Sequence, residues 1–277
     1  MNIQNENEPL FSEEEYLGLL ELTYSLAEAI SGKVFSDGRK PDSQLLALKL
    51  FTLAASAYQL YKGTRLPFPA STGGSDFIDF SSIAILTRSA IETYLTFFEV
   101  FVAPKNNDEF EFRYCLWYLS GYVSLEKFDP HDPDLQADYG KAQEEIFALR
   151  ERIKATSIYK SLKEGDQKDI LKGKRQRDWD KELDSAGFGK WTFRNVYRYN
   201  SGFVHADGLT TSQLMSAQTR EDQLFHAETD LVTMMVIISK FIVDYGSLYE
   251  EARLVLPRFE KIYKRALMWS DIARKLD

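Results

Sequence analysis

Apolar residues recur three and four positions apart along nearly the whole chain, and this spacing is the strongest constraint on the fold. An α-helix turns once every 3.6 residues, so the pattern places apolar side chains on one helical face. Residues that break helices are few, with 8 prolines and 15 glycines among 277 residues. There is no alternating pattern of useful length for a sheet and no internal repeat. The sequence therefore predicts an all-α protein.

Start and stop signals divide the chain into helices. Ser12 and Glu15 form a capping-box pattern, and Pro41 suits the first turn of a second helix. We expect long helices at 12–32, 41–62, 78–103, 108–126, 135–156, 191–205, 220–253 and 257–275, a short helix near 164–172, and loops at 63–76 and 172–190. These predict one domain over residues 1–277, a single bundle of about seven to eight helices. Its core helices lie within 12–253, those at 78–103 and 191–205 are central, and a C-terminal helix within 254–277 packs on the bundle.

Composition narrows the class of function. A net charge of -8, from 34 basic and 42 acidic residues, argues against a protein that coats nucleic acid. The single cysteine, Cys115, allows no internal disulfide and is compatible with a reducing compartment. The first residues contain acid and lack the apolar stretch of a signal peptide. The apolar stretches 83–103 and 231–243 are interrupted by charges or too short to span a bilayer. We expect a cytoplasmic protein with no membrane contact.

The apolar helix expected at 78–103 contains one polar stripe. Arg88, Glu92, Thr96 and Glu99 fall on one face, and burying Arg and Glu costs free energy unless they pair. Arg88 and Glu92 are four residues apart and can pair directly. The stripe must face another polar stripe, a water-filled pocket or solvent.

A matching stripe lies on the helix expected at 191–205. Arg194, Arg198, Ser201 and His205 share one face, and Gly202 leaves room beside it for a backbone or a ligand. Arg198 and His205 are two turns apart, about 10 Å between Cα atoms, so both side chains can converge on one phosphate. The helix C-terminus near His205 favours a protonated imidazole.

These residue types suit metal-independent RNA cleavage by the neighbouring 2′-hydroxyl. Histidine moves protons near neutral pH, and the planar fork of arginine binds phosphate. The basic run of Lys172, Lys174, Arg175 and Arg177 could guide a strand locally. The predicted catalytic residues are Arg198 and His205, and the supporting residues are Arg88, Glu92, Arg194, Tyr197 and Ser201.

The motif Arg198-x6-His205, late in a helical chain, resembles the Arg-x4-6-His motif of HEPN-domain proteins. Many of these are metal-independent endoribonucleases of bacterial defence and toxin–antitoxin systems, and they often act as dimers that bring two motifs together. HEPN nucleases usually have Asn, Asp or His directly after the arginine, where this chain has Tyr199. A closer resemblance covers residues 80–250. Arg88-x3-Glu92 followed by Tyr197-Arg198-x2-Ser201-x3-His205 is similar to the signature of an uncharacterised family of bacterial helical proteins. The resemblance implies RNA as substrate, a homodimer or a defence-system partner protein, and no cofactor.

Structural interpretations of the same residues stay open. His205 can cap a helix while Arg198 pairs with an acid such as Glu92, and the Ser201 hydroxyl can bond the backbone four residues back. His131, in the segment 129–134, is better explained by a turn than by a metal site, and we expect no metal.

Two alternative functions remain beside the nuclease. The first is a non-catalytic helical binding protein with a polar pocket lined by the same Arg, Glu and His residues. The second is a structural subunit of a larger complex, which predicts a large apolar surface patch. An exposed Arg198 and His205 would favour the nuclease, whereas an enclosed pair would favour a structural network.

Overall fold

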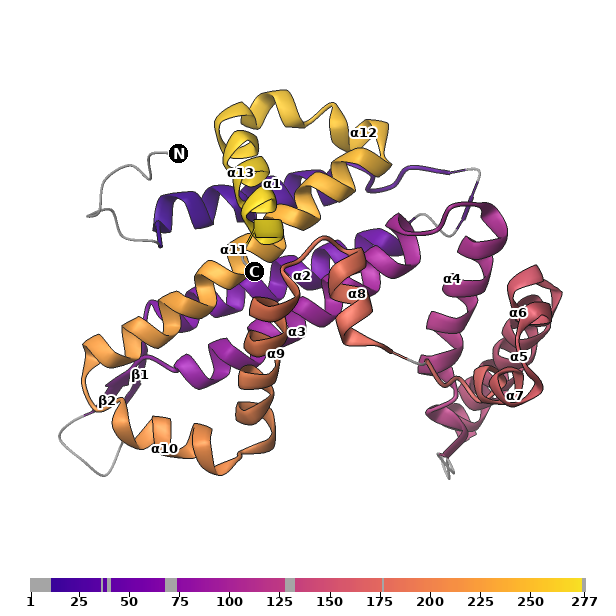
Figure 1. The fold of residues 1–277 in the computed structure, drawn as a ribbon, viewed down its shortest axis with the longest axis horizontal. Coiled ribbons are helices and arrows are strands. Elements are labelled where there is room, and N and C mark those ends of the chain that lie inside the picture. Colours follow the sequence, from indigo (N-terminus) through magenta and orange to yellow (C-terminus); the bar gives the residue numbers. More distant parts are fainter. Residues whose placement is uncertain are drawn as a thin grey trace. The chain divides into compact units, whose positions relative to one another are not determined.

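The computed structural model describes residues 11–35, 37–38, 41–67, 74–127, 133–175 and 177–275. This part of the chain is helical apart from one short hairpin, which confirms the all-α class (Figure 1). Its α-helices are α1 Glu13–Ala29, α2 Asp42–Tyr61, α3 Phe80–Phe97, α4 Asn107–Tyr122, α5 Pro133–Ala155, α6 Ser157–Ser161, α7 Glu164–Leu171, α8 Trp179–Ser185, α9 Lys190–His205, α10 Gly208–Ser216, α11 Arg220–Leu248, α12 Glu250–Arg253 and α13 Glu260–Lys275. The predicted number of seven to eight is too low, because α6, α8 and α10 lie outside the expected helices and the helix expected at 220–253 is divided into α11 and α12.

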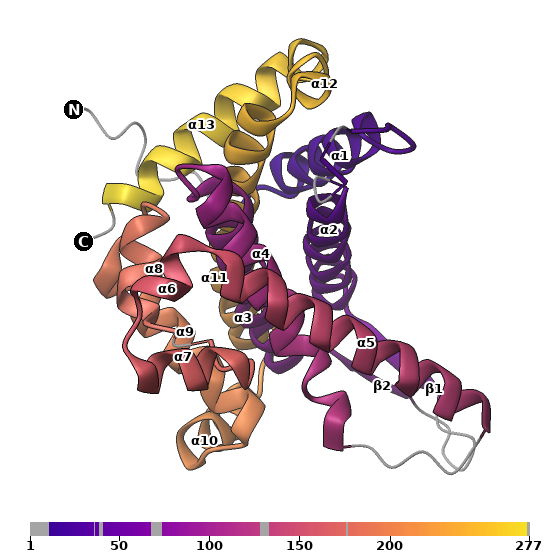
Figure 2. The same cartoon turned by 90° about the vertical axis from the view of Figure 1, so that its right-hand side faces the viewer.

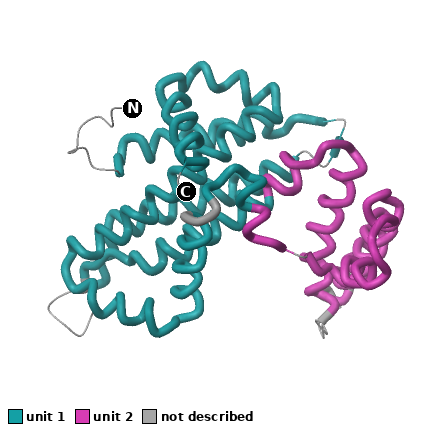
Figure 3. Tube along the Cα trace, in the orientation of Figure 1, with its two compact units in different colours: residues 1–96, 183–277 teal, residues 97–182 magenta. Residues whose placement is uncertain are grey.

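The chain forms two compact units, each described by itself (Figure 3). Unit 1 contains residues 1–96 and 183–277, and unit 2 contains residues 97–182. The single domain expected from the sequence stays a prediction.

Helix α11 is the core of unit 1. Fourteen of its residues are buried, and it packs against α1, α2, α12 and α13. Tyr94 in α3 donates a hydrogen bond of 2.6 Å to Asp244 in α11, which ties these two apolar helices together. Buried Lys240 lies 3.6 Å from the same carboxylate, and burial lowers the pKa of Lys240. The expectation that the helix at 191–205 is central is wrong, because one side of α9 is exposed.

The first helix begins as its capping pattern predicts, but only half of the capping box forms. The Ser12 hydroxyl accepts a hydrogen bond from the Glu15 backbone N–H at 3.3 Å. The Glu15 side chain, 9% exposed, instead accepts bonds from Arg265 and from the Trp269 indole N–H in α13. The acid that the motif assigns to a local cap therefore joins the first helix to the last one.

Besides α6, α8 and α12, three elements depart from the sequence prediction. Part of the loop expected at 63–76 forms an antiparallel hairpin of β1, Thr64–Pro67, and β2, Gly74–Phe77. Helix α3 is followed by a π-helical turn, Phe98–Val102, where one continuous helix was expected. Helix α10 forms directly after α9, where no helix was expected (Figures 1 and 2).

Unit 2 is built around α4 and α5, which pack against each other (Figure 2). Its core is rich in rings, with Phe101 in edge-on contact with Tyr114 and Trp117. Cys115 is also buried in this unit, and its thiol donates to Glu111 Oε1 at 3.4 Å. Two 3-10 turns complete the described elements of the chain, Leu125–Lys127 in unit 2 and Leu256–Phe259 in unit 1.

One described helix, α11, is long and apolar enough to cross a membrane by length and composition. The run 231–243, short by itself, continues within its 29 residues. However, 67% of its most apolar window is buried inside the protein, as in the core helix of a soluble protein. The cytoplasmic location stays a prediction.

Candidate functional site

The structure brings three of the predicted site residues into one cluster between α3 and α9. The Tyr197 hydroxyl donates to Glu92 Oε1 at 2.8 Å, and Arg88 Nη2 donates to the same hydroxyl at 3.3 Å. Arg88 also pairs with Glu92 at 3.2 Å and lies over the Tyr197 ring, with its Cζ 5.1 Å from the ring centroid. Burial is the largest cause that raises the pKa of Tyr197, and the bond to Glu92 adds to it. The two helices are therefore joined by a closed Arg–Glu–Tyr network.

Ser201 and Arg194 have different surroundings. The Ser201 hydroxyl donates to the Tyr197 backbone carbonyl at 2.7 Å, which confirms the backbone interpretation of this residue. That bond holds the hydroxyl against its own helix, and Ser201 makes no hydrogen bond to Arg88 or Glu92 in the described part of the chain. Arg194 lies one turn before Arg198 on α9 and is half-buried.

Arg198 and His205 are both exposed on α9. Within the described part of the chain, Arg198 makes no hydrogen bond or ion pair, and Glu92 pairs with Arg88 instead. The proposed pairing of Arg198 with Glu92 is therefore wrong. The two residues are seven apart on one helix, so they share a face and are open to a ligand.

The end of α9 explains why His205 lies at a helix terminus. Ala206 has a φ of 50°, a left-handed conformation that stops the helix, and Asp207 then caps α10 by accepting from the Thr210 backbone N–H at 2.9 Å. The Asp207 side chain lies against Gly202, so the space beside this glycine is used by the next helix. Hydrogen bonds from Thr210 are the largest cause that lowers the pKa of Asp207, and the charge of His205 contributes.

Three of the four basic residues at 172–177 are paired, and Lys172 alone is exposed without an ion pair among the described residues. Lys174 pairs with Asp169 at 2.9 Å, Arg177 pairs with Glu182 at 2.6 Å, and Arg175 forms an ion pair with Glu99. Each of these charges is already neutralised within unit 2. The run therefore has little charge left to guide an RNA strand.

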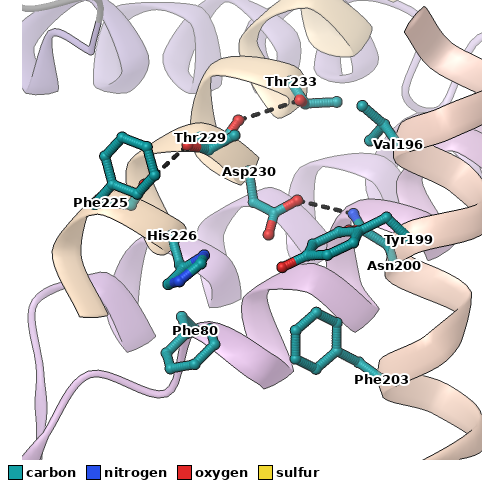
Figure 4. Close-up of a pocket in the computed structure, with 10 residues that line it drawn as sticks. All are labelled: Phe80, Val196, Tyr199, Asn200, Phe203, Phe225, His226, Thr229, Asp230 and Thr233. Carbon is teal, nitrogen blue, oxygen red and sulfur yellow. Dashed lines mark hydrogen bonds between the residues drawn. The ribbon is translucent and has the colours of Figure 1, made fainter. Parts of the chain in front are cut away.

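A cavity of about 270 Å³ lies between α3, α9 and α11, on another face of α9, and the sequence analysis missed it (Figure 4). It is lined by Phe80, Val196, Tyr199, Asn200, Phe203, Phe225, His226, Thr229, Asp230 and Thr233. None of these is among the predicted site residues. His226 is half-buried, and its ring stacks on Phe80 with centroids 4.9 Å apart.

Asp230 is the most unusual group in this cavity. It is 7% exposed, and Asn200 Nδ2 donates to its Oδ1 at 2.8 Å. Burial raises the pKa of Asp230 to about 7, and the bond from Asn200 opposes this only in part. Figure 4 shows the other carboxylate oxygen directed between His226 and Tyr199. A buried carboxylate with a perturbed pKa in a cavity is typical of a binding or catalytic site.

A sequence signal for this cavity exists, although it is weak. His226 and Asp230 are four residues apart and precede the apolar run 231–243, so they share one face of the same helix. Asn200 is the polar exception on the apolar side of α9. Only the packing of α9 on α11 shows that these residues meet.

Metal ligation finds no support in the described residues. In the ranges that the structure describes, no three His, Cys, Asp or Glu side chains gather as metal ligands would. His131 lies outside the described residues.

Comparison with protein-family models, curated protein sequences and solved structures finds no match for this chain. The resemblance to HEPN proteins therefore remains a hypothesis that depends on the residues quoted above.

Proposed function

We propose that the chain is a HEPN-like protein that cleaves RNA without a metal ion, with Arg198 and His205 as its catalytic residues. The observation that supports this proposal is the exposure of both residues on one face of α9. The Arg88–Glu92–Tyr197 network then acts as a support that fixes the position of α9 on α3.

The proposed reaction needs one phosphate clamp and two proton transfers. Arg198 holds the non-bridging oxygens of a phosphate with its planar guanidinium. An imidazole takes the proton of the 2′-hydroxyl as its oxygen bonds to phosphorus. A second imidazole gives a proton to the 5′-oxygen as the bond from phosphorus to that oxygen breaks. The products are a 2′,3′-cyclic phosphate and a 5′-hydroxyl, so no oxidant or metal is consumed.

Two imidazoles at one phosphate suggest two copies of the chain, each contributing His205. Helix α10 follows His205 almost directly and exposes Leu209, Leu214 and Met215. Exposed apolar side chains of this size are common at protein interfaces. Burial of α10 between two copies would bring the two His205 residues toward each other.

The test is cleavage of a pool of short labelled RNAs in excess EDTA by wild type, His205→Ala and Arg198→Ala. Asn195→Ala, exposed on the same helix, is the matched control. We expect the rate of cleavage to fall by a factor of at least about 100 in the two site variants and to stay normal in the control. All four proteins should melt alike, because exposed residues without partners contribute little to stability. Equal cleavage by wild type and His205→Ala would refute the proposal.

A second candidate is a non-catalytic binding protein, and the cavity between α3, α9 and α11 favours it. The residues that would bind are different from the predicted ones, because the cavity lies on another face of α9. An inactive wild type that still binds a small molecule would favour this candidate.

A further inference from the structure

The cavity between α3, α9 and α11 contains hydrogen-bond acceptors that the described residues leave unused. The Asp230 carboxylate accepts one bond, from Asn200 Nδ2, through its Oδ1 atom. The Asn200 Oδ1 atom is buried and has no hydrogen-bond partner among the described residues. Asn200 itself is fully buried. An unpaired buried acceptor costs free energy, so a group that donates hydrogen bonds to this place would be favoured.

Aromatic rings come from five of the ten residues that line the cavity. They belong to Phe80, Tyr199, Phe203, Phe225 and His226, and they contact one another (Figure 4). The faces of such rings attract cations, and their area favours a hydrocarbon body. Phe225 is 70% exposed, so one wall of the cavity reaches the surface.

We propose that this cavity binds a small organic cation whose charged nitrogen carries N–H groups, such as a protonated primary amine or an amidine, with Asp230 as its counter-ion. The N–H groups donate to the free oxygen of Asp230 and to Asn200 Oδ1. The hydrocarbon part of the ligand packs against the rings. This binding is separate from the proposed cleavage of RNA, and neither depends on the other.

Other ligand classes fit this arrangement less well. An anion would be repelled by Asp230 and would leave both acceptors unpaired. A neutral alcohol supplies one donor but no charge. A quaternary ammonium ion supplies the charge that the rings attract but has no N–H to donate. A neutral alcohol and a quaternary ammonium ion are therefore useful comparison probes.

Binding of a cation needs the charged form of Asp230, so it depends on pH. Because burial holds the pKa of Asp230 at about 7, the affinity for the cation should rise about tenfold per pH unit up to pH 7 and level off above it. The other titratable groups that face the cavity are His226 on α11 and Tyr199 on α9, whereas α3 contributes only Phe80. The measurement of affinity against pH is therefore repeated with His226→Gln, which should show the same dependence on pH.

The experiment is isothermal titration calorimetry of the full chain at pH 8 with benzylamine, benzyl alcohol and benzyltrimethylammonium. We expect benzylamine to bind and the other two to bind at least about tenfold more weakly. Asp230→Asn should remove the preference for benzylamine, whereas Glu221→Gln, exposed on the same helix, should keep it. Phe225→Ala should weaken the binding of benzylamine without changing the order of affinity among the three probes.

Three results would overturn the proposal. They are no binding of benzylamine by wild type, equal binding of benzylamine and benzyl alcohol, and an unchanged preference in Asp230→Asn. The Asp230→Asn variant should fold, because it removes a buried charge and keeps the shape of the side chain. Its melting curve and that of Phe225→Ala are recorded alongside, so that loss of binding is not confused with loss of structure.

Discussion

The Asn200 amide donates a hydrogen bond of 2.8 Å to Asp230, and this bond links the half-exposed α9 to the buried α11. The carboxylate is an expensive group at this position. Removal of a carboxylate from water favours its protonated form, and one amide donor offsets only part of that effect. A side chain that is costly for folding and faces a cavity is a candidate for function.

Asp230→Asn should therefore stabilise the protein in a way that depends on pH. The pKa of Asp230 is raised from 3.8 to about 7, so the folded state binds more protons than the unfolded state between these values. The stability contributed by this group is greatest below pH 4 and falls as the pH rises through 7, by about 4 kcal/mol at most. We expect the free energy of unfolding in urea to be similar for variant and wild type at pH 4. At pH 8 it should be about 2–4 kcal/mol higher for the variant. An equal gain in stability at pH 4 and pH 8 would contradict the raised pKa of Asp230.

Tyr197→Phe tests the support network of the proposed nuclease site. The change removes the bond to Glu92 and the contact with Arg88 but keeps the ring under the guanidinium. We expect the free energy of unfolding, measured in urea, to fall by about 1 kcal/mol. Tyr24→Phe is the control, because the ring of Tyr24 packs on Phe51 and its hydroxyl makes no hydrogen bond in the described residues. A loss of the same size in the control would mean that the network adds no stability.

Local signals predicted the parts of the fold that depend on neighbouring residues in sequence. The capping role of Ser12, the pairing of Arg88 with Glu92 and the bond from Ser201 to its own helix all lie within four residues. Helical spacing alone places these groups near each other. For the same reason the long helices were predicted to within a few residues.

What the sequence could not predict depends on contacts between distant segments. Helix α10 has one buried residue, Thr210, so it lacks the apolar periodicity by which helices are recognised. Its start depends on Asp207, which lies against Gly202 of the previous helix. The cavity was missed because Asn200 and Asp230 are thirty residues apart and meet only when α9 packs on α11.

Glu15→Gln should show how strongly the first and last helices depend on one buried carboxylate. Glu15 accepts from Arg265 Nε at 2.9 Å, from Arg265 Nη2 at 2.7 Å and from Trp269 Nε1. Loss of the charge weakens the two bonds from Arg265 and the bond from Trp269, so we expect about 2–3 kcal/mol of destabilisation. Glu14→Gln is the matched control, because Glu14 is exposed and pairs with Lys261 at 3.4 Å. Its effect in urea unfolding should stay below about 0.5 kcal/mol. Similar losses in both variants would show that the buried pairing adds nothing.

Gly202→Ala should separate the position of α10 from the chemistry of His205. A Cβ at residue 202 would lie 2.7 Å from Thr210 Cγ2 and closer still to the Asp207 carboxylate, which caps α10. The side chains must move, so we expect about 1–3 kcal/mol of destabilisation and faster hydrogen exchange in α10. Gly208→Ala is the matched control. A Cβ there meets nothing within 4 Å, and a gain of about 0.4–1 kcal/mol is expected from the stiffer unfolded chain.

If the proposed dimer forms through α10, Gly202→Ala should also lower RNA cleavage although Arg198 and His205 are intact. Slow exchange in α10 together with normal cleavage would show that α10 does not need the space at Gly202.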